Sequence, residues 1–250
     1  MMLATTAVRS GADIDRRPGI IGADDREPVD ATGPPWSAIG QVNISGYRTL
    51  YACTGALIAP RVVLTAAHCV IDPRTKEPFA PNHIHFAAGV RKDTVLGRSV
   101  AQCLKLPDGF RYIGPERVLA DLPFQRVPFE HFKLDLAVIV LADDIPAAGV
   151  APVLRHDVFT AGLPLTHASY PKDRRYMLTA DASCTALNRE RGVWLTDCDT
   201  HGASSGGPVL VLDAGELKVA AVMVGSIPGT ATLAVPVTQW AALPVGPDCP

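Results

Sequence analysis

Short runs of apolar and β-branched residues recur along most of this chain, and glycine, proline, asparagine and aspartate interrupt them. The runs are IGQVNI, GALIA, RVVLTAA, LDLAVIVL, PVLVL, LKVAAVMV and TATLAVPV. Runs of this length are typical of β-strands and are too short for most helices. The pattern therefore predicts an all-β fold, built either as a barrel or as a sandwich.

One helix is expected, near the C-terminus. It covers the segment VTQWAAL, residues 237–243, with Thr238 as its N-cap. A connection rich in proline, alanine and glycine, residues 143–152, divides the chain into two halves. We therefore expect a leader or propeptide-like segment at 1–19, an N-terminal unit at 20–145 and a C-terminal unit at 146–250.

The composition argues against several classes of function. The 250 residues include 23 basic and 25 acidic ones, the formal net charge is −2, and no basic block stands out. Binding to nucleic acid or to an anionic membrane is therefore not expected. The longest apolar runs, such as residues 136–142, are too short to span a bilayer. The first residues, MMLATTAV, lack the basic region of a signal peptide.

The cysteines are even in number, and their spacing favours disulfides. Cys53 and Cys69 lie symmetrically about a turn-like segment, as do Cys184 and Cys198. Residues that face each other in an antiparallel hairpin are close enough for a disulfide. The remaining pair, Cys103 and Cys249, follows by elimination. The alternative is a set of buried free thiols, while metal ligation is disfavoured because there is no C-x-x-C motif.

A pair of adjacent serines lies in the segment HGASSGGPVL, residues 201–210. A serine hydroxyl is a weak nucleophile until a neighbouring base activates it, and that base must itself be held in place. His68 is a candidate base, because it ends a β-branched run and adjoins Cys69, where a disulfide would fix the backbone. The alternative is that His68 has only a structural role.

Asp135 is a candidate partner for that histidine. It precedes the apolar run LAVIVL, and an unpaired buried carboxylate there would be costly. An imidazole N–H is a suitable donor to such a carboxylate. The alternative is a carboxylate at the start of a strand that faces solvent.

Three motifs in this order, LTAAHC, DLAVIVL and GASSGGPV, resemble those of the trypsin-like (chymotrypsin-fold) serine peptidases. The segment CTGALIAPRVVLTAAHC, residues 53–69, is similar to the first-disulfide segment of that family along nearly its whole length. Residues 20–42 resemble the mature N-terminus of the bacterial glutamyl-endopeptidase (V8-like) branch. The resemblance implies two antiparallel Greek-key β-barrels with the active site in the cleft between them.

The resemblance also implies roles for individual residues. The family serine directly precedes the GGP segment, so Ser205 is expected to be the nucleophile rather than Ser204. His68 is then the base, and Asp135 orients it. The amides of Ala203 and Ser205 are expected to form the oxyanion hole.

The resemblance places a substrate pocket beside the serine. The residues expected to line it are Asp199, Thr200, Met223, Gly225 and Ser226. An aspartate at that point accompanies basic specificity in trypsin relatives, but an Asp-Thr pair also occurs in glutamyl-specific ones. The glutamyl branch has a histidine where this chain has Met223. The sequence therefore leaves the specificity open.

The expected function is that of a secreted or periplasmic, monomeric serine endopeptidase that acts on polypeptides without metal or cofactor. A removable leader before Ile20 implies a zymogen, although Ser204 lacks the carboxylate that receives the new N-terminus in trypsin relatives. One alternative is an inactive family member that binds partners through its loops. The other is an all-β adhesive protein without peptidase activity.

Overall fold

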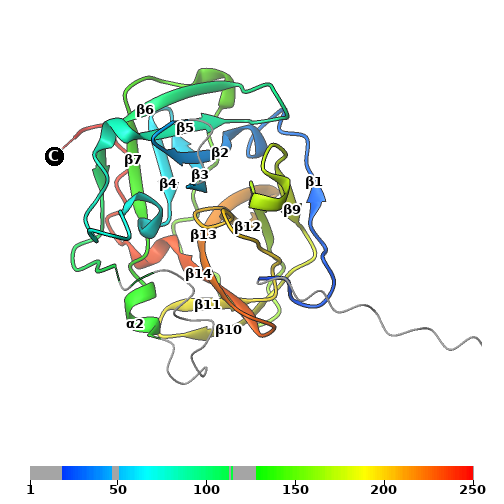
Figure 1. The fold of residues 1–250 in the computed structure, drawn as a ribbon. Helices are drawn as coiled ribbons and strands as arrows, with labels where there is room; N and C mark the ends of the chain where they lie inside the picture. Colours follow the sequence, from blue (N-terminus) through cyan, green and yellow to red (C-terminus); the bar gives the residue numbers. More distant parts are fainter. Residues whose placement is uncertain (1–18, 47–50, 113, 115–127, 250) are drawn as a thin grey trace, which may run out of the picture.

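The computed structural model describes residues 19–46, 51–112, 114 and 128–249, and these form two β-sheet units that lie side by side (Figure 1). The first unit is a closed antiparallel barrel in the order β2-β3-β4-β7-β6-β5. Its strands are β2 (Ile39–Ile44), β3 (Ala52–Ala59), β4 (Val62–Thr65), β5 (Ile84–Ala88), β6 (Gly97–Lys105) and β7 (Ala137–Leu141).

The second unit is an open, curled eight-stranded sheet in the order β1-β9-β8-β12-β13-β14-β11-β10. Its strands are β1 (Glu27–Pro28), β8 (Thr166–Ser169), β9 (Thr179–Asp181), β10 (Ala186–Glu190), β11 (Val193–Thr196), β12 (Pro208–Asp213), β13 (Glu216–Ile227) and β14 (Ala231–Pro236). The all-β prediction is confirmed, although the edge strands β1 and β10 leave this second sheet unclosed.

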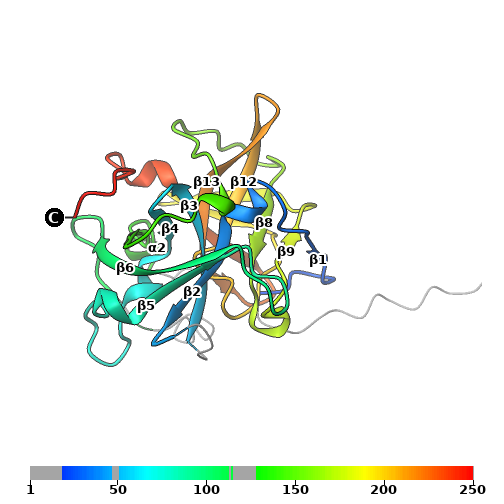
Figure 2. The ribbon, with the colours of Figure 1, turned by 90° about the horizontal axis from the view of Figure 1, so that it is seen from above.

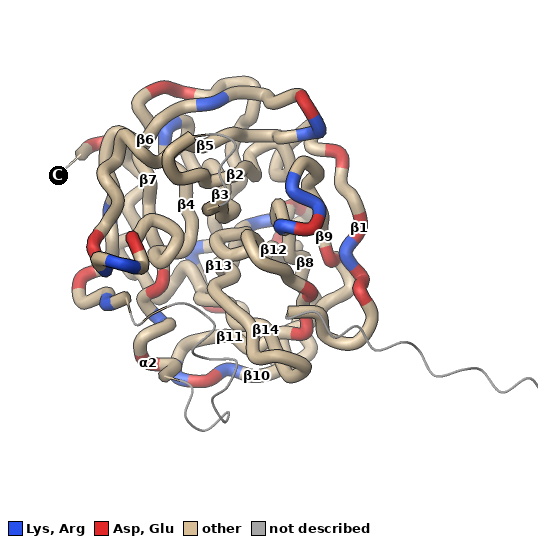
Figure 3. Tube along the Cα trace, viewed as in Figure 1, with Lys and Arg blue, Asp and Glu red and all other residues tan. Residues whose placement is uncertain are grey.

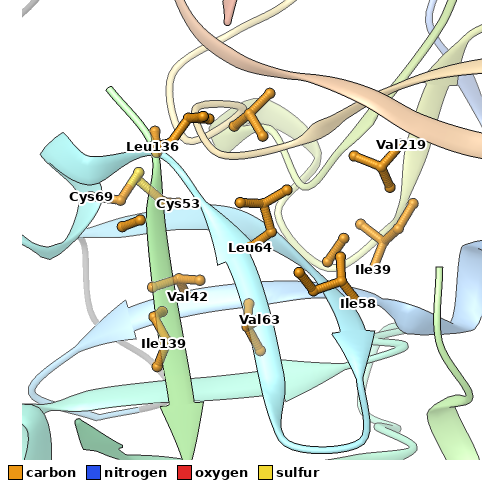
Figure 4. Packing of buried hydrophobic residues seen from close by; sticks show 14 of the residues in the cluster. Ile39, Val42, Cys53, Ile58, Val63, Leu64, Cys69, Leu136, Ile139 and Val219 are labelled. Carbon is orange, nitrogen blue, oxygen red and sulfur yellow. A yellow bond between two sulfur atoms is a disulfide. The ribbon is translucent and has the colours of Figure 1, made fainter. Parts of the chain in front are cut away.

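Apolar side chains from both units share one large core cluster, and a second, smaller cluster lies within the second unit. β7 is buried along its whole length, as expected for its unbroken apolar run. Figure 4 shows the barrel interior, in which Val42, Val63, Leu64 and Ile139 pack together. Val219, from β13 of the second unit, belongs to the same cluster. The two units are therefore held together by shared burial of apolar surface.

The described residues contain little helix. The one α-helix among them, α2 (Phe129–Phe132), is a single turn. Short 3-10 turns occupy Trp36–Ala38, Ala67–Val70, Pro81–His83, Pro146–Ala148, Lys172–Arg174 and Val237–Gln239. No helix in this part of the chain is both long and apolar enough to cross a bilayer.

The helix predicted at 237–243 is wrong. The chain makes only the 3-10 turn Val237–Gln239 there, and the residue at the N-cap position is Pro236, without a side-chain cap. Pro244 follows directly, and a residue before proline is disfavoured in the α-helical conformation. Pro236 offers no side-chain oxygen that could cap the first turn, so the segment lacks a helix start as well.

All six cysteines are joined as disulfides in the pairs that the sequence favoured. Cys184 and Cys198 flank the β10–β11 hairpin. Cys53 and Cys69 are not opposite each other in a ladder, since Cys53 pairs with Val42 and Cys69 lies in a 3-10 turn beyond β4.

The third disulfide, Cys103–Cys249, ties the C-terminal end of the chain to β6. The views in Figures 1 and 2 both place the C-terminal segment beside the first barrel. Lys105 Nζ also donates to the Gly246 carbonyl, at 3.2 Å. The C-terminal segment therefore leaves the second unit and is anchored on the first.

The N-terminal arm, residues 19–28, packs on the second unit. Ile20 is almost completely buried, and the Thr200 amide donates to the Gly19 carbonyl at 2.8 Å. The Asp199 carboxylate accepts from the Ile21 amide at 2.8 Å and from the Asp25 amide at 2.7 Å. The arm therefore covers Asp199 and removes it from solvent.

Ion pairs continue this attachment further along the arm. Charged residues lie mainly on the periphery of the trace, with both signs mixed (Figure 3). The side chain of Arg26 is nevertheless buried between Asp24 and Asp173, each 2.8 Å away. A buried guanidinium needs such partners, so Arg26 fixes the arm to the loop that carries Asp173.

Burial raises the pKa of Asp199 to about 6, the two arm amides counteract this, and nearby Asp181 and Asp24 raise it further. Between pH 4 and 6 the folded state therefore binds more protons here than the unfolded state, so stability falls as pH rises through this window. We expect wild type to lose about 2 kcal/mol more unfolding free energy than Asp199→Asn between pH 4 and pH 7. Denaturant titrations at each pH measure this difference, and parallel curves for the two proteins would contradict it.

Candidate active site

His68 and Asp135 lie at the same end of two neighbouring strands. Thr65, which ends β4, pairs with Ala137, which begins β7. His68 follows Thr65 by three residues and Asp135 precedes Ala137 by two. The antiparallel pairing therefore places the two side chains together, although 67 positions separate them in the sequence.

Asp135 holds His68 by two hydrogen bonds. Its Oδ2 lies 2.7 Å from His68 Nδ1, and its Oδ1 accepts from the His68 backbone amide at 2.8 Å. The carboxylate side chain is 7% exposed and the imidazole 20% exposed. The buried carboxylate thus fixes both the backbone and the ring of a histidine that still reaches the surface.

The Cys53–Cys69 disulfide lies beside the imidazole. Its two sulfurs and one His68 ring nitrogen all lie within 4.8 Å of one another. Both sulfurs are bonded to each other, so they are not available as the thiolates that bind metal. Cys69 Sγ also lies 3.6 Å from the Ser205 carbonyl oxygen. The disulfide is therefore adjacent to both His68 and the backbone of Ser205.

The loop that carries Ser205 turns sharply at Gly206. This glycine has φ +84°, and a Cβ added to it would lie 2.1 Å from both the Thr54 carbonyl oxygen and Thr65 Oγ1. The Gly206 amide donates to the Met223 carbonyl at 2.7 Å, and the Met223 amide donates to Gly207 at 2.9 Å. Only glycine fits this conformation and this space, so the turn fixes where Ser205 stands.

The two adjacent serines have different surroundings. Ser204 is buried, and its Oγ accepts from Ser169 Oγ at 2.9 Å and from the His201 amide at 3.1 Å. Ser205 is partly exposed. Ser204 thus has a structural role in the loop, which supports the choice of Ser205 as the reactive one.

Thr54, on β3, connects the first barrel to the serine loop, and sequence reasoning missed it. Its amide donates to the Ser205 carbonyl at 2.8 Å and its Oγ1 donates to the Ala203 carbonyl at 3.0 Å. The same hydroxyl accepts from the Tyr170 amide at 3.0 Å. Its position directly after Cys53 in the histidine-bearing segment is the only sequence signal that could have pointed to it.

Ala203 has a left-handed backbone, with φ +75°, which is uncommon for a residue other than glycine. Its carbonyl points to Thr54, and its amide has no hydrogen-bond acceptor among the described residues. An amide in this state can serve as a donor to a bound group.

A small hollow of about 30 Å³ opens beside Ser205. Its walls are formed by Thr200, His201, Gly202, Ser204, Ser205, Met223, Gly225 and Ser226. Four of the five pocket residues expected from the sequence therefore lie together here. Asp199 is not among the lining residues, because its carboxylate faces the N-terminal arm. His201 was not anticipated.

Comparison with known proteins identifies the family. The trypsin-like peptidase domain matches residues 53–220, which is more than half of the chain. The CLIP domain-containing serine protease B15 of Anopheles gambiae is 44% identical over 46 residues, which are 18% of this chain and 13% of that protein. The chain thus spans only a small part of that relative's length.

Solved structures share the fold. One, described as the structure of Glu endopeptidase in complex with MPD, has a TM-score of 0.69 and 22% identity, over 87% of this chain and 93% of that one. The protease Anisep from Arthrobacter nicotinovorans has a TM-score of 0.63 and 18% identity, over 86% and 93%. The family match covers more than half of the chain, and the fold and the His68–Asp135 pair agree with it. This chain therefore belongs to the trypsin-like peptidase domain family.

Proposed function

We propose that this protein is a serine endopeptidase that hydrolyses peptide bonds through Ser205, His68 and Asp135. The observation that carries the proposal is the pair of hydrogen bonds from His68 to the buried Asp135 carboxylate. The proximity of the Cys53–Cys69 disulfide to both His68 and the Ser205 backbone adds support. A base that is rigidly oriented beside a serine is the arrangement that nucleophilic catalysis requires.

In the proposed mechanism the Ser205 hydroxyl attacks the substrate carbonyl carbon. Because Nδ1 of His68 is bonded to Asp135, the other ring nitrogen, Nε2, accepts the serine proton. His68 then gives this proton to the leaving amine, and an acyl-enzyme remains. Water, activated by the same imidazole, releases the acid and restores Ser205. Asp135 fixes the tautomer and stabilises the charged imidazole.

The negative charge that develops on the carbonyl oxygen requires donors. We assign this role to the amides of Ala203 and Ser205, as the sequence resemblance implied. The left-handed backbone of Ala203 and the hydrogen bond from Thr54 Oγ1 to its carbonyl support the assignment, because both restrain the backbone of the residue whose amide is the proposed donor. Thr54 is thus a positioning residue for the oxyanion site.

The three disulfides favour a location outside the reducing cytosol, so we propose that the enzyme is secreted or periplasmic. Residues 1–18 lie outside the described part of the chain, and their removal in a mature form remains a proposal. Ser204 has no carboxylate to receive a new terminus, and the Ile21 amide is instead bonded to Asp199. We therefore propose that Ser205 is competent before any processing.

Alanine substitutions at Ser205 and Ser204 test which of the two serines is the nucleophile. Ser205→Ala is expected to lower kcat by about 10⁶, the scale of a comparable removal in another serine peptidase. Ser204→Ala is the matched control and should lose far less, because it removes two hydrogen bonds and not the nucleophile. Labelling by a fluorophosphonate, read by intact mass, should vanish only in Ser205→Ala. If the label persists in that variant, another residue is the nucleophile.

Asp135→Asn tests the orienting carboxylate. The substitution keeps the size of the side chain but disfavours the correct histidine tautomer, so kcat should fall by about 10⁴ while the fold is retained. Circular dichroism and thermal unfolding check the fold, and hydrolysis of a casein-type substrate measures kcat. Full activity in this variant would assign the role to a different carboxylate.

Chains that begin at Met1, Ile20 and Ile21 test the proposed independence from processing. Active-site titration of Ser205 and kcat/KM should agree among them within about tenfold, a difference of about 1.4 kcal/mol in transition-state stabilisation. An inert Met1 chain, with a gain above about 10³-fold on trimming, would show that an N-terminal switch exists.

A further inference from the structure

Met223 forms a fixed wall of the hollow beside Ser205. Met223 lies in β13, and its backbone is hydrogen-bonded to Gly206 and Gly207, on the nucleophile loop. Met223 is 1% exposed and belongs to the core cluster of the second unit, with Trp194, Cys198 and Ala234. The Met223 wall cannot move away without disturbing that core.

The space is small. The hollow measures about 30 Å³, and one water molecule requires about 10–15 Å³ of such space. The hollow therefore takes about two water-sized groups, which suits a side chain of one or two heavy atoms. A long or aromatic side chain would have to displace Met223 or remain outside.

Among the described residues, the lining contains no carboxylate that could pair with a cationic substrate side chain. Thr200 and Ser226 contribute hydroxyls, and both oxygens of Asp199 are bonded to the arm amides of Ile21 and Asp25. A cationic substrate side chain therefore finds no carboxylate in the hollow, and burial of an unpaired charge is costly.

His201 is the one titratable side chain in the lining. Its Nδ1 lies 3.7 Å from the Asp173 carboxylate, which is itself bonded to Arg26. No lysine or arginine in the described part of the chain lines the hollow, so an acidic side chain would find only His201 as a positively charged partner. The Asp173 carboxylate beside Nδ1 already competes for that imidazole, so the lining gives an acidic substrate residue little compensation for its burial.

We propose that this hollow admits only a short, uncharged side chain, such as alanine or serine, at the P1 position of the substrate, and that Met223 sets this limit. P1 is the residue whose carbonyl Ser205 attacks. The inference rests on the proposed peptidase activity and adds the substrate class to it. Met223 is thus a specificity-determining residue, whereas Asp199 anchors the N-terminal arm and does not bind the substrate side chain.

The test is a set of fluorogenic peptides that differ only at P1, with alanine, serine, valine, phenylalanine, glutamate and lysine. The wild-type protein should show kcat/KM for alanine and serine at least about 10²-fold above phenylalanine, glutamate and lysine, since misfit in a closed pocket produces factors of this order. A preference for glutamate would identify His201 as the reading group and overturn the proposal. A preference for lysine would identify Asp199 as the residue that binds the substrate side chain, and it would also overturn the proposal.

Met223→Ala should raise kcat/KM for the valine peptide, relative to alanine, by at least about tenfold. Met223→Val, a smaller truncation, should move the ratio in the same direction if the alanine variant does not fold. Met177→Ala is the matched control, because Met177 lies outside the hollow. Unchanged ratios in both folded Met223 variants would overturn the assignment of Met223.

Fluorophosphonate labelling separates the two proposals. Absence of both labelling and cleavage would contradict the peptidase activity itself. Labelling of Ser205 without cleavage of the alanine or serine peptides would contradict only the inference about the hollow.

Discussion

The hydrogen bond from the Thr54 amide to the Ser205 carbonyl joins the two β units at the point where the candidate catalytic groups meet. Thr54 lies within β3 and is completely buried, so its polar groups must be bonded inside the protein. Its hydroxyl meets this requirement through Ala203 and Tyr170. A shift of the serine loop would break several of these bonds at once, which explains how two separate sheets hold one site in register.

Much of the fold could be predicted because local patterns determine it. The unbroken apolar run before residue 142 is typical of a strand buried on both faces, and it forms β7. The symmetric cysteine spacings led to the disulfides that the structure has, since the intervening segments are short hairpins. Residue chemistry made His68 and Asp135 candidates, but the family resemblance was needed to choose this pair, because the β4–β7 contact that brings them together is long-range.

Other features depend on contacts that no local pattern records. The position of Asp199 in the sequence, six residues before Ser205, predicts a pocket residue. In the structure its carboxylate instead accepts hydrogen bonds from the N-terminal arm. Thr54 carries no motif of its own, and its role follows from the approach of the second unit. The segment 237–243 has a helical pattern, but it begins without a side-chain cap and is followed at once by Pro244. In each case tertiary packing or a flanking residue overrides the local preference.

The Cys103–Cys249 bond has a consequence for how the molecule responds to proteolysis. It closes a ring that contains the connection between the two units, residues 143–152, and every strand of the second unit except β1. A single break of the backbone anywhere inside this ring yields two chains that stay covalently attached. Exposed connections are where proteases nick folded proteins first, so a single cut there would leave the molecule in one piece. Its fragments would separate only after reduction, so the redox state of the surroundings would decide how long a nicked molecule stays whole.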